Sequence, residues 1–134
     1  MNYELGIMNG VTCRVFGKEN AVVNKSKQFA LRIIKLYQYL TETKKEYVMS
    51  KQILRSGTSI GSNIREAIRA QSKPDFYTKL YISLKEAEES LYWLELLYES
   101  GYIEKNHFDS IYADAEEIVK ILVAITKNQG KTIS

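Results

Sequence analysis

The chain has few residues that could bind a metal ion, form a disulfide bond or interrupt a helix. Its 134 residues include one cysteine, one histidine, one proline and seven glycines. Cys13 alone cannot form an internal disulfide, and one Cys with one His cannot supply the usual zinc ligand sets within one chain. So little Pro and Gly predicts long helices rather than many short strands.

Long apolar runs and targeting signals are also missing. No stretch of about 18 or more apolar residues could span a bilayer, so we expect no membrane partner. The N-terminus, MNYELGIMNG, lacks the basic start and apolar core of a signal peptide. Together with the single cysteine, these absences predict a cytoplasmic protein. Apolar residues make up 45% and charged residues 26% of the chain, which is typical of one globular domain.

No constellation of residues suggests catalysis. Acidic clusters at 86–89 and 114–117 could imitate a carboxylate-bridged di-iron bundle, but that site needs paired Glu-x-x-His motifs. His107 is the only histidine, and the Glu104 that precedes it has no second copy of the motif to pair with. Since nothing supplies a nucleophile–base pair either, we predict a non-enzymatic protein without a cofactor or metal ion. The acidic clusters are then expected on solvent-exposed faces, and His107 on the surface.

The chain does contain helical periodicity. Apolar residues recur at spacings of three and four in four segments, at about 26–41, 49–71, 73–100 and 105–127. The sequence SKPD at 72–75 has the capping-box pattern of a helix start, and Gly101 is a good residue to end that helix. Short connections between four amphipathic helices predict an all-α, antiparallel up-down-up-down four-helix bundle.

Residues 1–23 lack this periodicity. The segment VTCRVF at 11–16 alternates weakly between apolar and polar residues and has a glycine on either side. We therefore predict an extended N-terminal arm over 1–23, with a short strand as one form of it. A helical bundle over 24–128 and a C-terminal tail over 129–134 complete the predicted organisation.

The predicted helix at 49–71 has two different sides. On a helical wheel, Ile53, Ile60 and Ile64 share one side with Gly57 and Gly61. Each glycine lowers helix propensity by about 1 kcal/mol relative to alanine, so we expect the close approach of a facing helix to offset this cost. The alternative is that Gly57 separates two shorter helices.

The opposite side is rich in hydrogen-bonding and charged groups and allows two interpretations. We favour a structural polar network, because serine and asparagine are poor helix formers and several occur here on one helix. The members of this network would be Arg55, Ser59, Asn63, Glu66 and Asp75. The second interpretation is nucleic-acid binding through phosphate contacts. Its candidate cations are Lys51, Arg55, Arg65 and Arg69, with Lys44 and Lys45 as outer contacts.

The predicted helix at 73–100 has more apolar surface than one bundle core needs. The surplus residues, on the side opposite Leu80 and Leu91, are Tyr81, Ile82, Tyr92, Trp93 and Leu96. Exposed apolar patches of this kind usually mark an interface, in which Trp and Tyr are enriched. We therefore predict self-association through this face. The alternative is that the N-terminal arm covers it. Tyrosines could also stack on nucleic-acid bases, although most of the ten lie at core or interface spacing.

The net charge of +3 is too small to imply nucleic-acid binding, but it is unevenly distributed. Residues 24–72 carry ten Lys and Arg against three Glu, a net of +7, whereas residues 73–134 carry seven Lys against eleven Asp and Glu, a net of −4. A basic side that meets the acidic side of the next copy favours a head-to-tail ring over a two-fold dimer. The alternative is scatter on solvent-exposed faces.

The run RSGTSIGSNIREAIRAQSKPDFYTKLYISLKEAEESLYWL resembles the bacterial four-helix bundle family of 23S rRNA intervening sequence proteins. The resemblance covers roughly 24–127, and its most specific part comprises Arg55, Ser59-Ile60, Asn63-Ile64, Glu66 and Asp75-Phe76. Many members have Ala-Glu-Gly after the Asn-Ile pair. This chain has Arg65-Glu66-Ala67 there and so departs from the family pattern at position 67.

The resemblance implies an up-down four-helix bundle that assembles into a ring, commonly a pentamer. It also implies kinship with accessory proteins of diversity-generating retroelements, which bind nucleic acid and a reverse transcriptase. No activity follows from it. Residues and resemblance together predict a non-enzymatic homo-oligomer that binds structured RNA or a ribonucleoprotein. The alternative is a protein-interaction scaffold that binds no nucleic acid.

Overall fold

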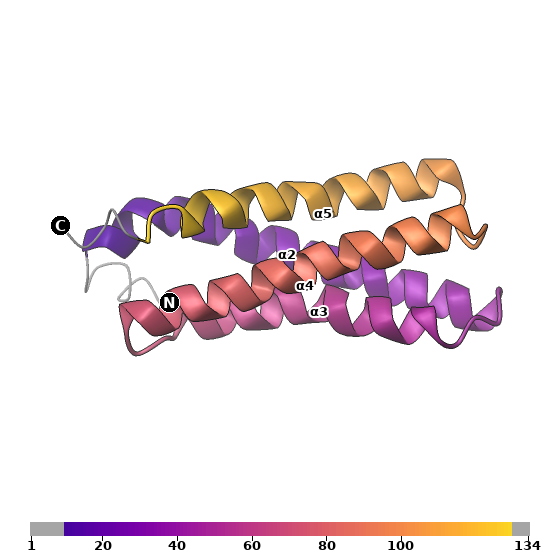
Figure 1. The fold of residues 1–134 in the computed structure, drawn as a ribbon, viewed down its shortest axis with the longest axis horizontal. Helices are drawn as coiled ribbons and strands as arrows, with labels where there is room; N and C mark the ends of the chain where they lie inside the picture. Colours follow the sequence, from indigo (N-terminus) through magenta and orange to yellow (C-terminus); the bar gives the residue numbers. More distant parts are fainter. Residues whose placement is uncertain (1–9, 130–134) are drawn as a thin grey trace.

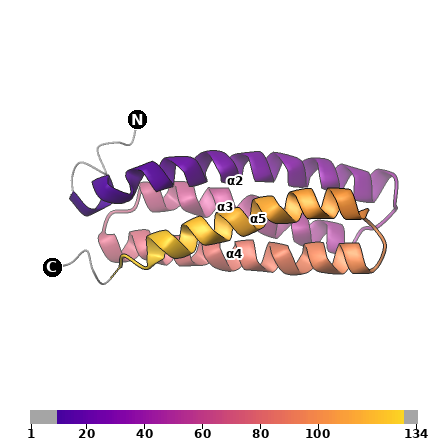
Figure 2. The ribbon, with the colours of Figure 1, turned by 90° about the horizontal axis from the view of Figure 1, so that it is seen from above.

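The computed structural model describes the backbone of residues 10–129 and the side chains of residues 21–129. Within that range the chain forms no strand, and its helices are α2 (Gly10–Glu42), α3 (Met49–Ile68), α4 (Lys73–Glu99) and α5 (Lys105–Thr126). Successive helices run in opposite directions along one elongated bundle (Figure 1, Figure 2). The predicted all-α, up-down-up-down bundle is confirmed.

The start of the first helix differs from the prediction. Residues 10–23 are not an extended arm, because they belong to α2, which runs without interruption from Gly10. The apolar stripe of α2 continues upstream of the expected start: Val22 is fully buried, seven positions before the buried Phe29. Interior glycine at position 17 does not stop the helix, since one glycine costs only about 1 kcal/mol of helix propensity. The rest of the predicted arm, 1–9, lies outside the described residues, as does most of the predicted tail.

The core consists of one apolar stripe from each helix. In α2 the stripe is formed by Phe29, Ile33, Leu36 and Leu40, none of which is more than 1% exposed. The other helices contribute Ile53, Ile60, Ile64, Leu80, Ala87, Leu94, Ile111, Ala115, Ile118 and Leu122. Helix α2 packs against α3 and α5, and α4 packs against the same two helices from the other side. The bundle therefore leaves an outer face on every helix, including α4.

Glycine in α3 allows close contact with α2. A Cβ atom at Gly57 would lie 2.8 Å from Cγ1 of Ile33, and one at Gly61 would lie 3.1 Å from Oγ of Ser26. The first separation is too short for a Cβ atom, and the second would require Ser26 to move by a few tenths of an ångström. The predicted close approach is therefore confirmed. The alternative of a break at Gly57 is wrong, because α3 is continuous from Met49 to Ile68.

The connection between α2 and α3 is held by Glu46. Its carboxylate accepts hydrogen bonds from the backbone N–H groups of Val48 (3.2 Å), Met49 (3.0 Å) and Ser50 (2.7 Å). Burial of Glu46 raises the pKa of this carboxyl group, but the three backbone hydrogen bonds together outweigh it, so the pKa lies below its ordinary value. An anion here also compensates the positive end of the α3 dipole. Helix α3 therefore begins at a carboxylate cap from the preceding loop.

The turn between α3 and α4 follows the sequence signals. Oγ of Ser72 accepts a hydrogen bond from the backbone N–H of Asp75 at 3.2 Å, and Pro74 lies in the first turn of α4. Helix α3 ends at Ile68, three residues earlier than predicted, because the N–H groups of Arg69 and Ala70 bond to carbonyls three positions back and close the last turn. Consequently Arg69 lies at the exposed edge of the turn.

Candidate nucleic-acid interface

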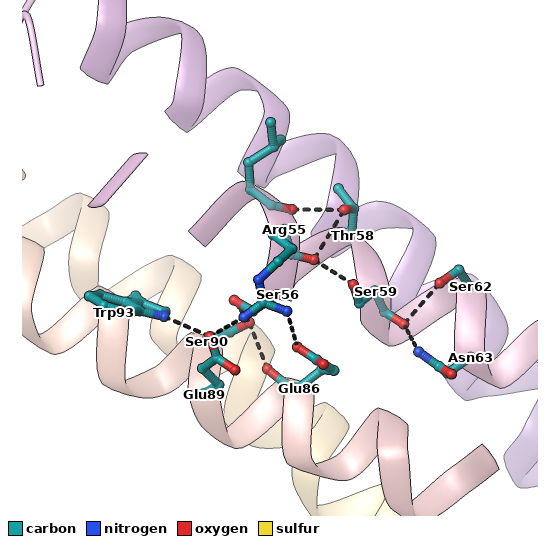
Figure 3. A network of polar contacts seen from close by, with 11 residues as sticks. Arg55, Ser56, Thr58, Ser59, Ser62, Asn63, Glu86, Glu89, Ser90 and Trp93 are labelled. Atoms are coloured by element: carbon teal, nitrogen blue, oxygen red, sulfur yellow. Dashed lines mark hydrogen bonds and ion pairs between the residues drawn. The ribbon is translucent and has the colours of Figure 1, made fainter. Parts of the chain in front are cut away.

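Arg55 does not face solvent as an unpaired cation. Its guanidinium makes ion pairs with Glu89 and, at 3.1 Å from Nη1 to Oε1, with Glu86, both on α4 (Figure 3). The indole N–H of Trp93 donates to the same Glu89 carboxylate at 3.0 Å. The pKa of Glu89 lies below its ordinary value, chiefly because of the hydrogen bond from Trp93. Burial raises this pKa, and the hydrogen bond and positive charge of Arg55 lower it further. Arg55 therefore ties α3 to α4 and is a poor candidate for binding phosphate.

The remaining members of the predicted polar network bond mainly to backbone. Oγ of Ser59 donates to the carbonyl of Arg55 at 2.6 Å, and Nδ2 of Asn63 donates to the carbonyl of Ser59 at 2.9 Å (Figure 3). Such bonds to the preceding turn are the usual way for these side chains to be satisfied inside a helix. Glu66 instead pairs with Lys79 of α4 at 3.1 Å. Among the described residues, these side chains are therefore not linked to each other, and Asp75 lies on another helix, in the first turn of α4.

Three buried serines form polar contacts between α3 and α4 that the sequence analysis missed. The Oγ atoms of Ser56 and Ser90 lie 2.9 Å apart, and Ser83 donates to the carbonyl of Ile60 at 2.8 Å. All three serines are completely buried. Their positions in the sequence carried a signal, because Ser83 and Ser90 alternate with Leu80, Ala87 and Leu94 on the apolar side of α4.

Arg65 and Arg69 lie at the C-terminal end of α3, beside the turn into α4. Both are exposed, and neither pairs with a carboxylate among the described residues. With Lys79 they line an open hollow of about 390 Å³, whose remaining residues are Glu66, Ala70, Gln71 and Asp75. We call Arg65, Arg69 and Lys79 the arginine corner. Its two guanidinium groups make no ion pair among the described residues, so they do not hold the bundle together.

Lys44, Lys45 and Lys51 lie at the other end of α3. All three are exposed and have no ion-pair partner among the described residues. Lys51 and Arg69 are eighteen positions apart, which corresponds to about 27 Å along a helix at 1.5 Å per residue. The predicted basic face is therefore divided into two corners, with the neutralised Arg55 between them.

The predicted interface residues lie on the outer face of α4. Tyr81, Ile82 and Tyr92 have exposed fractions of 43%, 36% and 54%. Trp93 and Leu96 are only half-buried; Trp93 packs edge-on against Tyr92, with ring centroids 5.5 Å apart. The arm does not cover this face over residues 10–23, which lie in a helix that packs on α3 and α5. An apolar face of α4 is therefore left in contact with solvent by the described residues.

The candidates for metal chemistry lie apart. Among the side chains of residues 21–129, no group of three or more His, Asp or Glu could hold a metal ion. In the acidic cluster of α5, Asp114 pairs with Arg32 at 2.7 Å and Glu117 with Lys25 at 3.2 Å. His107 is exposed in the first turn of α5, as predicted. None of the described helices is sufficiently long and apolar to cross a bilayer.

These features define a class: an antiparallel four-helix bundle with a polar α3 that is tied to α4 by an arginine and by serines. A model of the 23S rRNA-intervening sequence proteins matches residues 18–124, and the chain belongs to this family. The family resemblance predicted from the run at 55–94 is thereby confirmed.

The fold also matches a solved structure. The match is the crystal structure of a protein with unknown function from the S23 ribosomal protein family of Bacteroides thetaiotaomicron. Its sequence is 57% identical to that of this chain. The match covers 82% of this chain and 98% of the other, with a TM-score of 0.81. No protein of curated function matches.

Proposed function

We propose that this protein is a non-enzymatic, self-associating helical bundle of the cytoplasm that binds RNA in a ribonucleoprotein through the backbone phosphates. The observation that carries the proposal is the arginine corner. Arg65 and Arg69 are exposed and unpaired among the described residues and share an open hollow with Lys79. Guanidinium groups match phosphate geometry, and unpaired ones carry no cost of breaking an existing ion pair.

The structure changes the set of residues that we expect to contact phosphates. Arg55 leaves the set of phosphate-binding candidates because Glu86 and Glu89 occupy its guanidinium. Lys79 joins the set, although it must share its charge with Glu66 at 3.1 Å. Lys44, Lys45 and Lys51 remain as a second group of contacts at the far end of α3. Binding through phosphates should be largely independent of sequence and should weaken strongly with salt.

Titration of a labelled structured RNA at two salt concentrations, followed by fluorescence anisotropy, tests the proposal. The double variant Arg65→Glu/Arg69→Glu should lose at least about tenfold in affinity at low salt. The matched control is Lys27→Glu/Lys120→Glu, which makes the same change in net charge at exposed lysines of α2 and α5. Absence of binding by the wild-type protein at low salt would refute RNA binding. An equal loss in both double variants would show that only net charge matters.

Self-association is the second part of the proposal. Tyr81, Ile82 and Tyr92 are exposed apolar side chains of α4, and Leu31 and Ile34 are exposed apolar side chains of α2. Two different apolar regions on one molecule are what a head-to-tail contact between copies requires. The α2 residues belong to the basic part of the chain, 24–72, and the α4 residues to the acidic part, 73–134. Opposite charge would therefore also attract one region to the other. We therefore propose a ring of copies, with a pentamer as the expected size from the family resemblance.

Native mass spectrometry tests the ring. Tyr92→Glu should lower the assembly mass, because a carboxylate in an apolar contact is expensive to desolvate. A wild-type monomer at micromolar concentration, or a dimer alone, would contradict it. If the ring forms but no RNA binds, the protein is a scaffold for protein partners, which is the alternative function that the exposed face of α4 favours.

A further inference from the structure

The end of the bundle where α2 turns into α3 presents two tyrosines beside three lysines. Tyr47 has an exposed fraction of 52% and Tyr39 of 37%. The amino group of Lys44 lies 6.0 Å from the centroid of the Tyr39 ring. Lys45 precedes Tyr47 by two positions, and Lys51 follows it by four. We call Tyr39, Tyr47 and the lysines 44, 45 and 51 the tyrosine corner.

The loop that carries this corner is fixed by hydrogen bonds on both sides. The N–H groups of Thr43 and Lys44 donate to the carbonyl of Tyr39 at 2.9 and 3.2 Å, and that of Glu46 donates to the carbonyl of Leu40 at 2.9 Å. On the other side, the Glu46 carboxylate accepts hydrogen bonds from the backbone N–H of Val48 and from the first two N–H groups of α3. Tyr47 therefore lies in a loop whose backbone is already fixed, so stacking on its exposed ring would not require ordering of that backbone.

Charge at this corner favours an anionic partner. The acids of residues 39–51 are Glu42 and Glu46. Glu46 is buried and directed at the amides of α3, so its charge is compensated there. None of the three lysines pairs with a carboxylate among the described residues. Exposed aromatic rings between unpaired cations are the arrangement that holds single-stranded nucleic acids, in which bases stack on rings and lysines contact phosphates.

We infer that the tyrosine corner binds unpaired bases of single-stranded RNA, with Tyr47 as the principal stacking surface. This inference rests on the proposed function and specifies which RNA is bound and where. A base pair in a duplex is already stacked on both sides and offers no free face to Tyr47. The corner should therefore discriminate single-stranded from double-stranded RNA, whereas the arginine corner, acting on phosphates, should bind both.

The experiment compares an unstructured uridine-rich oligonucleotide with a duplex of the same length by fluorescence anisotropy. Tyr47→Leu keeps an apolar side chain and removes the ring, and Tyr47→Phe keeps the ring. Tyr47→Leu should weaken single-strand binding by about fivefold or more while Tyr47→Phe leaves it unchanged. Duplex binding should stay the same in both. Ser110→Ala, which changes an exposed residue of α5 outside every proposed binding surface, is the control and should have no effect.

The other outcomes overturn the inference in distinguishable ways. If wild-type protein binds RNA and Tyr47→Leu binds equally well, the stacking site is refuted while the proposed function stands. Absence of RNA binding in every protein tested would refute both. A fall in assembly mass on native mass spectrometry with Tyr47→Leu, with single-strand affinity following the mass, would assign the corner to a contact between copies instead.

Discussion

The N-terminal half and the C-terminal end of α3 carry arginines in opposite settings. In the N-terminal half, Arg55 is held by two glutamates of α4, on a helix that begins at a buried carboxylate. At the C-terminal end, Arg65 and Arg69 have no carboxylate partner among the described residues and border an open hollow. The difference indicates that the first half of α3 serves stability and that its end is free for a ligand. Changes in the two regions should therefore have separable effects.

The largest effect on stability is expected at Gly57. A leucine there must displace Ile33, whose Cγ1 lies only 2.8 Å from the position of a Cβ atom. Overpacking of this kind typically costs up to about 3 kcal/mol, and the gain in helix propensity over glycine, about 1 kcal/mol, offsets part of it. Urea denaturation of Gly57→Leu should therefore show a net loss of up to about 2 kcal/mol. Ser62→Leu on the exposed side of α3 is the control and should be nearly neutral.

The second effect concerns the carboxylate at the start of α3. Glu46→Gln keeps an acceptor oxygen but removes the charge that binds three N–H groups, so we expect a loss of about 1 kcal/mol at neutral pH. Because folding lowers the pKa of Glu46, its contribution is complete above the unfolded value of about 4.5 and is lost as the pH falls through the lower, folded value. The difference in stability between wild type and variant should therefore shrink below about pH 4.5. A difference that stays constant to pH 2 would contradict this cap.

The third effect is the loss of the tie between α3 and α4. Arg55→Ala leaves Glu86 and Glu89 close together without their cation. The side chains are partly exposed, so screening by solvent limits the expected loss to about 0.5–1 kcal/mol. Chemical denaturation in low and high salt measures it, and the loss should be smaller in high salt. A loss of RNA affinity in Arg55→Ala without loss of stability would return this arginine to the binding surface.

The sequence could not predict that Arg55 is ion-paired while Arg65 and Arg69 are not. Signals that act over a few residues predicted structure well: the Ser72 cap starts α4 as expected, and Gly101, with its φ of +89°, follows the end of that helix. The partners of Arg55, by comparison, lie 31 and 34 positions away on another helix. Their contact depends on how α3 and α4 are aligned along the bundle, which periodicity does not determine. For the same reason, Arg55 and Arg65 were given one role in the sequence analysis.

The smallest effect on stability is expected at the C-terminal end of α3. In Arg65→Ala/Arg69→Ala no described ion pair is lost, and substitutions at exposed sites usually change stability by less than about 0.5 kcal/mol. RNA binding should respond instead. If each guanidinium contacts one phosphate, the slope of log affinity against log salt should decrease by roughly 1 for each arginine removed.

Parallel titrations of Arg55→Ala and of the double variant over a series of salt concentrations complete the comparison. Arg55→Ala should lower stability and leave the salt slope unchanged, whereas the double variant should lower the slope and leave stability unchanged. A double variant that unfolds more easily than Arg55→Ala would show that the arginine corner is structural. An unchanged slope in the double variant, with RNA still bound, would move the phosphate contacts to the lysines at the opposite end of α3, because those cations are the other unpaired ones that the sequence analysis selected.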